Sequence, residues 1–129
     1  MYEIAVERSF WAAHAVTIDA TPEPTHRHNW RVRVVFEGRE LDDDGVVCDF
    51  HALERSIEGV IGGLDDRTLN GLPCFEGLGP TAERVARHIA DRVEVPAAVS
   101  VVCVEVTESP GCVATYRPDR TSQPSRSRG

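Results

Sequence analysis

Alternating apolar and polar residues predict strands at both ends of the chain. Residues 2–16 begin in alternation and end in a continuous apolar run, which predicts a strand with a bulge near residues 8–10. Residues 29–37 alternate most regularly, with large apolar side chains on one face and arginines on the other. Valine-rich segments at 99–107 and 112–116 predict two further strands, the first of them buried over much of its length.

The middle of the chain carries helical spacing instead. Apolar residues recur every three or four positions over residues 50–62, directly after Asp49, a suitable N-cap. A second helical pattern follows Pro80. The link before the first helix predicts an exposed acidic turn and a short strand at 46–48. The order ββααββ predicts an α+β fold, in which two helices cover one face of a four-stranded antiparallel sheet.

The composition is that of one globular domain. The 129 residues predict a single domain at 1–117 and a disordered tail at 118–129, where serine, arginine and proline dominate. No apolar run approaches the roughly 18 residues of a membrane span, and no secretory leader is recognisable, so we expect a cytoplasmic protein. The net charge of −7 argues against a nucleic-acid partner. Unpaired sheet edges favour a homo-oligomer.

The basic residues and the cysteines restrict the chemistry. All fourteen basic residues are arginine, so a phosphate group would be bound by arginine or by backbone amides, and a Schiff-base lysine is excluded. The four cysteines show no Cys-x-x-Cys spacing and lie mostly in apolar segments. They are predicted to be free thiols in a reducing compartment.

Three of the five histidines lie within fifteen residues, at His14, His26 and His28. In an extended segment His26 and His28 project from the same face, and the loop between the first two strands must return His26 towards His14. Three imidazoles with one open position are typical of a catalytic zinc site. The other reading is a chance His-x-His at the end of a strand. His51 and His88 lack ligand company, and we expect structural or solvent-facing roles for them.

The order of several short motifs resembles the family of 6-pyruvoyltetrahydropterin synthase and bacterial 6-carboxytetrahydropterin synthase. The matching residues are Phe10-x-Ala12-Ala13-His14, His26-x-His28-Asn29, Asp49-Phe50-x-x-Leu53, Leu64-Asp65 with Leu69-Asn70, Pro80-Thr81-Ala82-Glu83, and Glu108-x-Pro110 before Ala114-x-Tyr116. The resemblance covers residues 2–117. It implies a tunnelling fold, a hexamer built as a dimer of trimers, and sites between subunits, so that Glu108 could serve a zinc held by a neighbour.

The resemblance also implies roles for individual residues. Zn²⁺ would be held by the three histidines named above and would acidify side-chain hydroxyls of a small-molecule pterin, dihydroneopterin triphosphate or a relative. Glu108 would anchor the pterin, because a carboxylate can accept two parallel hydrogen bonds from an amino-pyrimidine edge. Thr107 and the segment Thr81, Ala82 and Glu83 would lie beside the pterin.

The chain departs from the family at three positions. The loop at 15–25 holds no cysteine, although the family's catalytic cysteine precedes the His-x-His motif. Asp66 replaces the relay histidine that follows Asp65, and Arg27 replaces the glycine between two ligand histidines. Thiol and imidazole groups titrate near neutral pH whereas a carboxyl group normally does not, so the usual proton relay is altered. Arg27 is expected either to clamp a phosphate or carboxylate beside the zinc, or to point away as the middle residue of the motif.

Glu23 offers a substitute base. The spacing Glu-x-x-His-x-His resembles a variant of the family that forms 6-hydroxymethyl-dihydropterin by carbon–carbon cleavage. Glu23 could equally be a solvated loop residue. Asp65 and Asp66 are further catalytic candidates, and Asp65 is preferred because adjacent residues seldom face one pocket. Cys74 is a weaker candidate nucleophile, since no neighbouring residue in the sequence would lower its pKa.

Three functions remain open from the sequence. The first is a zinc-dependent pterin lyase. The second is a zinc- and pterin-binding homologue without synthase activity, and the third is an enzyme of the same fold acting on another pterin or purine-like substrate.

Overall fold

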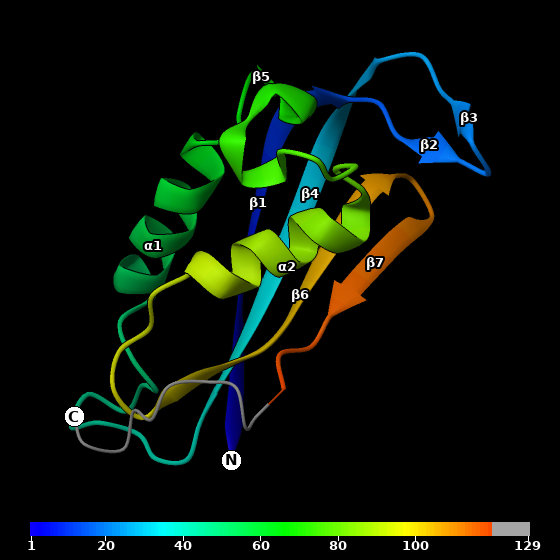
Figure 1. The fold of residues 1–129 in the computed structure, drawn as a ribbon. Coiled ribbons are helices and arrows are strands. Elements are labelled where there is room, and N and C mark those ends of the chain that lie inside the picture. Colours follow the sequence, from blue (N-terminus) through cyan, green and yellow to red (C-terminus); the bar gives the residue numbers. More distant parts are fainter. Residues whose placement is uncertain (120–129) are drawn as a thin grey trace.

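Two helices cover one face of a twisted sheet (Figure 1). The computed structural model describes residues 1–119. The sheet has five strands in the order β5-β1-β4-β6-β7, and all neighbours are antiparallel except β5, which runs parallel to β1. The strands are β1 (Tyr2–His14), β4 (His26–Gly38), β5 (Arg67–Thr68), β6 (Val99–Ser109) and β7 (Cys112–Tyr116), and the helices are α1 (Phe50–Gly62) and α2 (Ala82–Arg92).

The α+β fold and the order of the four long strands and two helices are confirmed. The prediction of four strands missed β5, a two-residue strand that pairs only with Ala12 and Ala13 of β1. So short an element has no periodicity from which it could be recognised.

Two local predictions were wrong. The bulge near residues 8–10 is absent, because β1 and β4 pair without a break from Tyr2 to His14. The apolar run continues the alternation, with Phe10 buried in the core and Trp11 on the other face, 46% exposed. Residues 46–48 form bends rather than a strand. Asp42 explains this difference, since its carboxylate accepts hydrogen bonds from the backbone N–H groups of residues 44 and 46 and closes a local loop instead.

The core lies between the sheet and the helices. Alternation along β4 buries Trp30, Val32, Val34 and Phe36 in one core with the inward side chains of α1 and α2. Each helix begins at a residue whose side chain accepts a backbone N–H, which is Asp49 for α1 and Thr81 for α2. The tail predicted at 118–129 lies outside the described residues from residue 120 onwards. No helix within residues 1–119 is long and apolar enough to cross a membrane.

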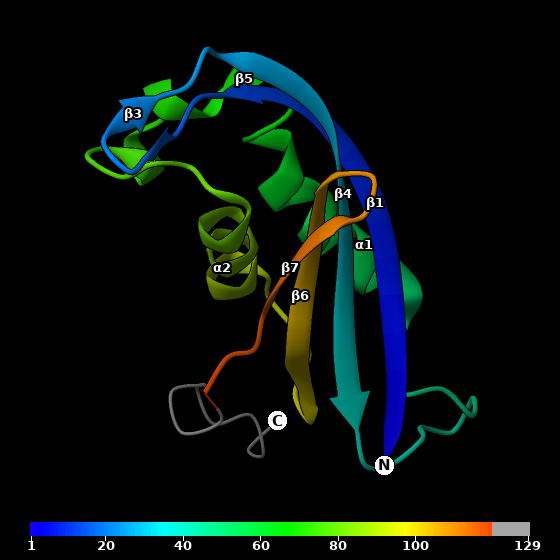
Figure 2. The same ribbon diagram turned by 90° about the vertical axis from the view of Figure 1, so that its right-hand side faces the viewer.

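One end of the sheet bends over the helices, as Figure 2 shows for β1 and β4. Between these strands the chain forms a small hairpin of β2 (Thr17–Ile18) and β3 (Thr21–Pro22). Two 3₁₀ turns, η1 (Leu69–Gly71) and η2 (Pro73–Phe75), connect β5 to α2 at the same end. The end of β1, the start of β4 and the hairpin therefore meet close to the N-terminus of α2.

Candidate metal and substrate site

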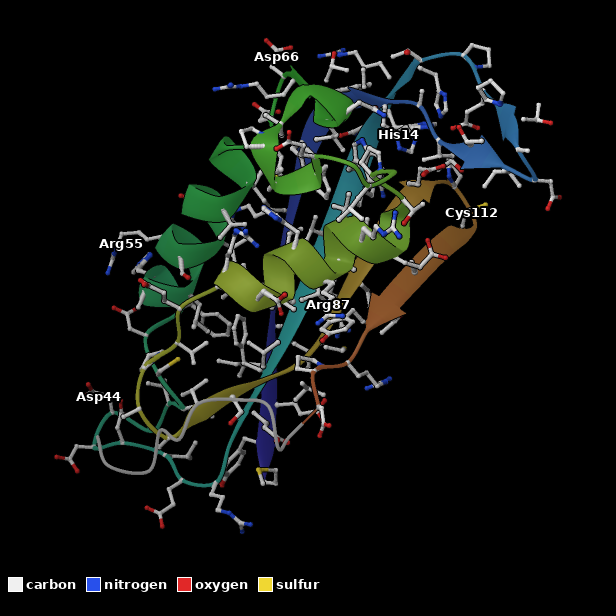
Figure 3. The ribbon with its side chains drawn as sticks, viewed as in Figure 1. His14, Asp44, Arg55, Asp66, Arg87 and Cys112 are labelled. Atoms are coloured by element: carbon white, nitrogen blue, oxygen red, sulfur yellow. The ribbon has the colours of Figure 1, made fainter. Side chains whose placement is uncertain are left out.

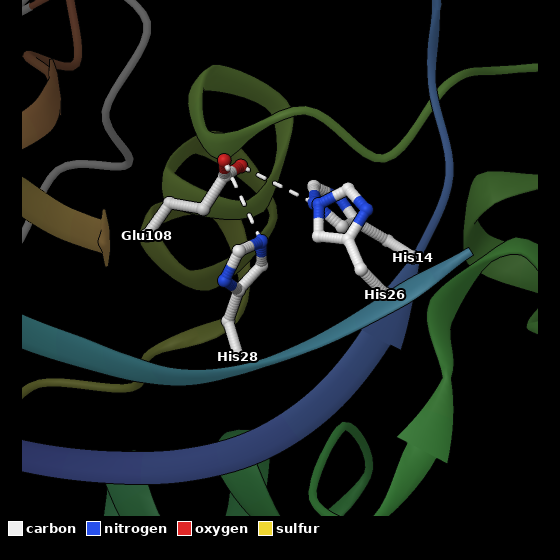
Figure 4. Close-up of side chains that lie close together, drawn as sticks. All are labelled: His14, His26, His28 and Glu108. Atoms are coloured by element: carbon white, nitrogen blue, oxygen red, sulfur yellow. Dashed lines mark hydrogen bonds and ion pairs between the residues drawn. The ribbon is translucent and has the colours of Figure 1, made fainter. Parts of the chain in front are cut away.

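The three candidate zinc ligands converge at the bent end of the sheet. His14, the last residue of β1, lies directly opposite His26, the first residue of β4, and His28 follows on the same face. One ring nitrogen of each histidine and one carboxylate oxygen of Glu108 all lie within 4.8 Å of one another (Figure 4). The pairing of β1 with β4 thus brings together the three histidines that the sequence predicted as metal ligands.

The hydrogen bonds of two histidines leave lone pairs facing each other. His14 Nδ1 lies 2.8 Å from the carbonyl oxygen of Pro80, and His26 Nδ1 lies 2.9 Å from that of Pro24. A carbonyl only accepts, so in each ring Nδ1 carries the proton and, in the neutral imidazole, Nε2 carries a lone pair. The two Nε2 atoms are 3.1 Å apart. A cation between them would remove this repulsion, and two nitrogens bound to one tetrahedral zinc lie at a similar distance, roughly 3.3 Å.

His28 supplies the third nitrogen in a form suited to a metal. Its Nε2 atom is buried and has no hydrogen-bond partner. Burial is the main cause that lowers the pKa of His28, and the neighbouring Glu108 opposes this shift. A lowered pKa favours the neutral imidazole, which is the ligand form. The residues therefore fit a divalent metal such as zinc.

Glu108 closes the fourth side of the cluster. Its two carboxylate oxygens lie 3.4 Å from His14 Nε2 and 3.7 Å from His28 Nε2. The register between β6 and β7 shifts between Thr107 and Ser109, so Glu108 sits at a bulge. A bulge bends its strand and re-aims a side chain, which explains how Glu108 reaches histidines of the same chain.

Two pockets border this carboxylate. The first, the hairpin pocket, has a volume of about 390 Å³ and is lined by Val16, Ile18, Glu23, Thr81, Ala82, Glu83, Glu108, Cys112, Val113 and Ala114. The second, the notch pocket, has a volume of about 420 Å³ and is lined by Arg27, His28, Asn29, Arg31, Thr107, Glu108, Ser109 and Pro110. All five residues predicted to lie near a pterin line one of these pockets: Thr81, Ala82 and Glu83 the first, Thr107 the second, and Glu108 both.

Glu23 belongs to the same site. Its Oε1 atom lies 3.8 Å from His26 Nε2 and accepts a hydrogen bond of 3.1 Å from the backbone N–H of Val16. The Glu23 N–H in turn donates to the carbonyl of Val16. The hairpin therefore holds this carboxylate, whose side chain is 35% exposed, beside His26.

Asn70 is a residue whose place in this arrangement the sequence did not reveal. Its side-chain amide accepts from the N–H of Ala15 at 2.9 Å and donates to the carbonyl of Ala15 at 2.8 Å. Ala15 stands between the metal candidate His14 and Val16, the partner of Glu23. The only available sign was Leu69-Asn70 among the family motifs, and it carried no role.

Asp65 and Asp66 lie outside the histidine cluster of their own chain. The Asp65 carboxylate accepts from the N–H of Trp11 at 3.0 Å, and the Asp66 N–H donates to the Trp11 carbonyl. Asp66 projects outward at this end whereas His14 lies inside (Figure 3). Of the two readings of Arg27, the one that points away is confirmed. Its guanidinium stacks on the Trp11 ring at 4.7 Å and lies 3.4 Å from Asp66 Oδ1.

The cysteines are free thiols within the described residues. Cys74 lines a different hollow, between the end of α1 and α2, with the half-buried His88. It is absent from the cluster around His14. Nothing in that geometry connects Cys74 to the metal candidates.

Comparison with known proteins places the chain in a family. Residues 3–119 match the family model of 6-pyruvoyl tetrahydropterin synthase. The dihydroneopterin monophosphate aldolase of Pyrococcus furiosus is 39% identical over 90 residues, which cover 70% of this chain and 73% of that protein. The 6-carboxy-5,6,7,8-tetrahydropterin synthase of Bacillus subtilis is 28% identical over 133 residues, with 92% and 87% covered.

Solved structures show the same fold. The 6-pyruvoyl tetrahydropterin synthase of Caenorhabditis elegans has a TM-score of 0.74 at 23% identity, and 92% of this chain and 98% of that chain are covered. A Plasmodium vivax 6-pyruvoyltetrahydropterin synthase in which a catalytic glutamate is replaced by alanine has a TM-score of 0.70 at 20% identity, with the same coverage. The match of the family model over nearly all described residues, together with the 39% identical relative, shows that the chain belongs to the 6-pyruvoyl tetrahydropterin synthase family.

Proposed function

We propose that this protein is a zinc-dependent lyase that cleaves the side chain of a phosphorylated dihydroneopterin to give 6-hydroxymethyl-dihydropterin. The observation that carries the proposal is the Glu23 carboxylate, held 3.8 Å from His26 Nε2 in a loop that lacks the family's cysteine. A carboxylate in that place can accept a proton from a substrate hydroxyl next to the three imidazoles.

The cleavage is a retro-aldol reaction and needs no oxidant. Glu23 takes the proton of the second side-chain hydroxyl, and the carbon–carbon bond between the first and second side-chain carbons breaks as that oxygen becomes a carbonyl. The electron pair passes into the ring imine, and the first side-chain carbon then regains a proton, which Glu23 can return. Zinc held by His14, His26 and His28 would supply Lewis-acid polarisation of the hydroxyl.

Glu108 and the start of α2 are proposed to hold the ring. The half-buried Glu108 carboxylate can accept two hydrogen bonds from the amino-pyrimidine edge. Thr81, Ala82 and Glu83 form the opposite wall of the hairpin pocket, so a ring there would lie between Glu108 and Glu23. The pocket volume is within the range usual for small-molecule sites.

Two relatives support this chemistry. The Pyrococcus furiosus relative is a dihydroneopterin monophosphate aldolase, and the Plasmodium vivax protein has a glutamate as a catalytic residue. The Bacillus subtilis relative, a 6-carboxytetrahydropterin synthase, supports the same substrate class but a different product.

We further propose that the protein assembles, as a hexamer of two stacked trimers. Within residues 1–119, β1 pairs with β5 only at residues 12 and 13, so the rest of that sheet edge is unpaired there, and β7 forms the other edge. Unpaired edges are usually covered or paired. Trp11 and Val113 are exposed near the two edges, at 46% and 56%. Asp65 and Asp66 lie beside the β1 edge, so a catalytic role for them would require the site of a neighbouring subunit.

The test is identification of products. Zinc-loaded protein is incubated with dihydroneopterin monophosphate and, separately, with the triphosphate, and products are analysed by mass spectrometry. With the monophosphate we expect 6-hydroxymethyl-dihydropterin and glycolaldehyde phosphate. Glu23→Gln should slow formation of both products by about a hundredfold or more, whereas Glu76→Gln, a matched change at an exposed glutamate, should not.

Two results would contradict the proposal. If the protein binds the pterin but forms no product above background, it is a pterin-binding homologue and not a lyase. A 6-pyruvoyl or 6-carboxy product would assign the synthase reaction of the other relatives.

A further inference from the structure

The notch pocket arises because β6 is shorter than β4 at this end of the sheet. The β4–β6 pairing ends at Arg31 and Thr107, and residues 26–30 of β4 pair only with β1. The turn after β6 closes the far side of the gap. The pocket adjoins the metal site at the end of β6, because His28 and Glu108 line it and also belong to the histidine cluster. Arg31 lines it from the opposite face of β4, the face of Arg27 and Arg33.

Arg31 is the cation of this pocket that has no partner. Among residues 1–119, its side chain makes no hydrogen bond or ion pair, and it is exposed. The two neighbouring arginines on this face of β4 are engaged. Arg27 contacts Asp66 and Trp11, and Arg33 lies between Glu7 and Glu105 at 3.4 and 3.2 Å.

The groups around Arg31 suit a phosphate. Thr107 lies directly across from it in the strand pair, so its hydroxyl is within reach of the same ligand. Ser109 adds a second hydroxyl to the pocket wall. Glu108 is the one carboxylate among the residues that line this pocket, and its oxygens face His14 and His28. Glu7 and Glu105 line the neighbouring pocket together with Arg31, and both of them pair with Arg33. A guanidinium and two hydroxyl groups can each donate hydrogen bonds to the oxygens of one phosphate group.

We propose that Arg31, with Thr107 and Ser109, binds the phosphate group of the substrate and so selects phosphorylated over unphosphorylated dihydroneopterin. The inference rests on the proposed function, since it assumes a pterin at the adjoining metal site. It assigns to Arg31 the phosphate contact that the sequence allowed for Arg27. Because the chain has no lysine, a side-chain cation that binds the phosphate must be an arginine, and the proposal assigns this role to Arg31.

The experiment uses unreactive oxidised ligands. Isothermal titration calorimetry measures binding of neopterin and of neopterin 3′-monophosphate to the zinc-loaded protein, to Arg31→Gln and to Arg55→Gln. Arg55 is exposed on α1, so its variant removes the same charge away from the pocket. Circular dichroism and zinc content check that both variants are folded and loaded.

We expect the phosphate to tighten binding about tenfold or more in the wild-type protein and in Arg55→Gln. In Arg31→Gln this gain should be lost, while neopterin itself binds as before. An equal gain in both variants would overturn the role of Arg31. If the phosphate adds nothing in the wild type, the phosphate site is refuted while the lyase proposal stands, and if neither ligand binds, both proposals fail.

Discussion

Two regions at the same end of the sheet carry residues from the family's motifs, but the side chains that surround them differ. The first is the histidine cluster on the helix-facing side, with His14, His26, His28, Glu108 and Glu23. The second is the β5 edge, where Asp65 and Asp66 bond to the backbone of Trp11.

Antiparallel pairing and alternation place the three histidines of the cluster on one face, and the bulge in β6 and the hairpin bring Glu108 and Glu23 beside them. Within residues 1–119, neither Asp65 nor Asp66 at the β5 edge belongs to the histidine cluster. Their carboxylates contact a backbone N–H or an arginine instead of the histidines. The comparison teaches that a shared motif predicts position in the fold, whereas the chemistry depends on which other side chains face that position.

The largest effect we expect is loss of metal from the cluster. His14→Ala should weaken zinc binding by more than about a hundredfold, because loss of an outer hydrogen-bond partner alone often costs 10–100-fold. Competition with a chromogenic chelator measures the affinity. His51→Ala, a histidine on the surface of α1, should bind zinc like the wild type. Full zinc affinity in His14→Ala would refute the assignment of His14 as a metal ligand.

A smaller effect is expected from replacing Asn70, which follows β5 and bonds to Ala15 beside His14. Asn70→Ala removes both hydrogen bonds to Ala15 and should lower the free energy of unfolding by about 1–2 kcal/mol. Product formation should fall as well, because Ala15 connects His14 to the residue that holds Glu23. Asn70→Asp keeps the acceptor but loses the donor, so it should be intermediate in urea unfolding and in rate. If both variants lose stability while the rate per zinc-loaded protein is unchanged, the positioning role is wrong.

Within the edge, the two aspartates should differ. Asp65→Ala leaves the Trp11 N–H without its acceptor and should cost about 1 kcal/mol in urea unfolding. Asp66→Ala should cost less than about 0.5 kcal/mol, since its pair with Arg27 is exposed, with side chains 84% and 54% accessible. The opposite ranking would show that the Arg27–Asp66 pair stabilises this edge.

The smallest expected effect concerns pH and lies outside both regions. His88 is a residue of α2 that contacts the ring of Phe75, and its burial lowers its pKa. The unfolded chain therefore binds the proton more readily, so stability falls as the pH drops through about 6.5 and stops falling below the folded-state pKa. His88→Gln should lose less stability than the wild type between about pH 7.5 and 5.5. Parallel pH profiles in urea unfolding would contradict this.

Much of the fold and the metal candidates followed from local pattern. Alternation identified the long strands, Asp49 and the helical spacing identified α1, and His-x-His on a strand predicted a shared face. The resemblance named Glu108 as the pterin anchor, and this role stays a prediction; in the structure its carboxylate lies beside His14 and His28 of its own chain.

Other features depend on contacts that no local pattern encodes. The two-residue β5, the Asn70 contact with Ala15 and the partner of Arg27 all join residues far apart in the sequence. The position of Glu23 depended on a hairpin whose turn at Asp19 and Ala20 has positive φ at both residues, which non-glycine residues seldom adopt. Propensity alone would not have chosen that turn.

The most direct test of the account compares Glu23→Gln with Asp65→Asn in one assay. Both variants replace a carboxylate by an amide, and both are measured for product formation from dihydroneopterin monophosphate under zinc saturation, with zinc content determined for each. We predict that Glu23→Gln loses about 10²–10⁴-fold in rate while retaining zinc, and that Asp65→Asn keeps its rate and loses only stability. A normal rate in Glu23→Gln, with loss of activity in folded, zinc-loaded Asp65→Asn, would contradict the account and move the proton transfer to the β5 edge.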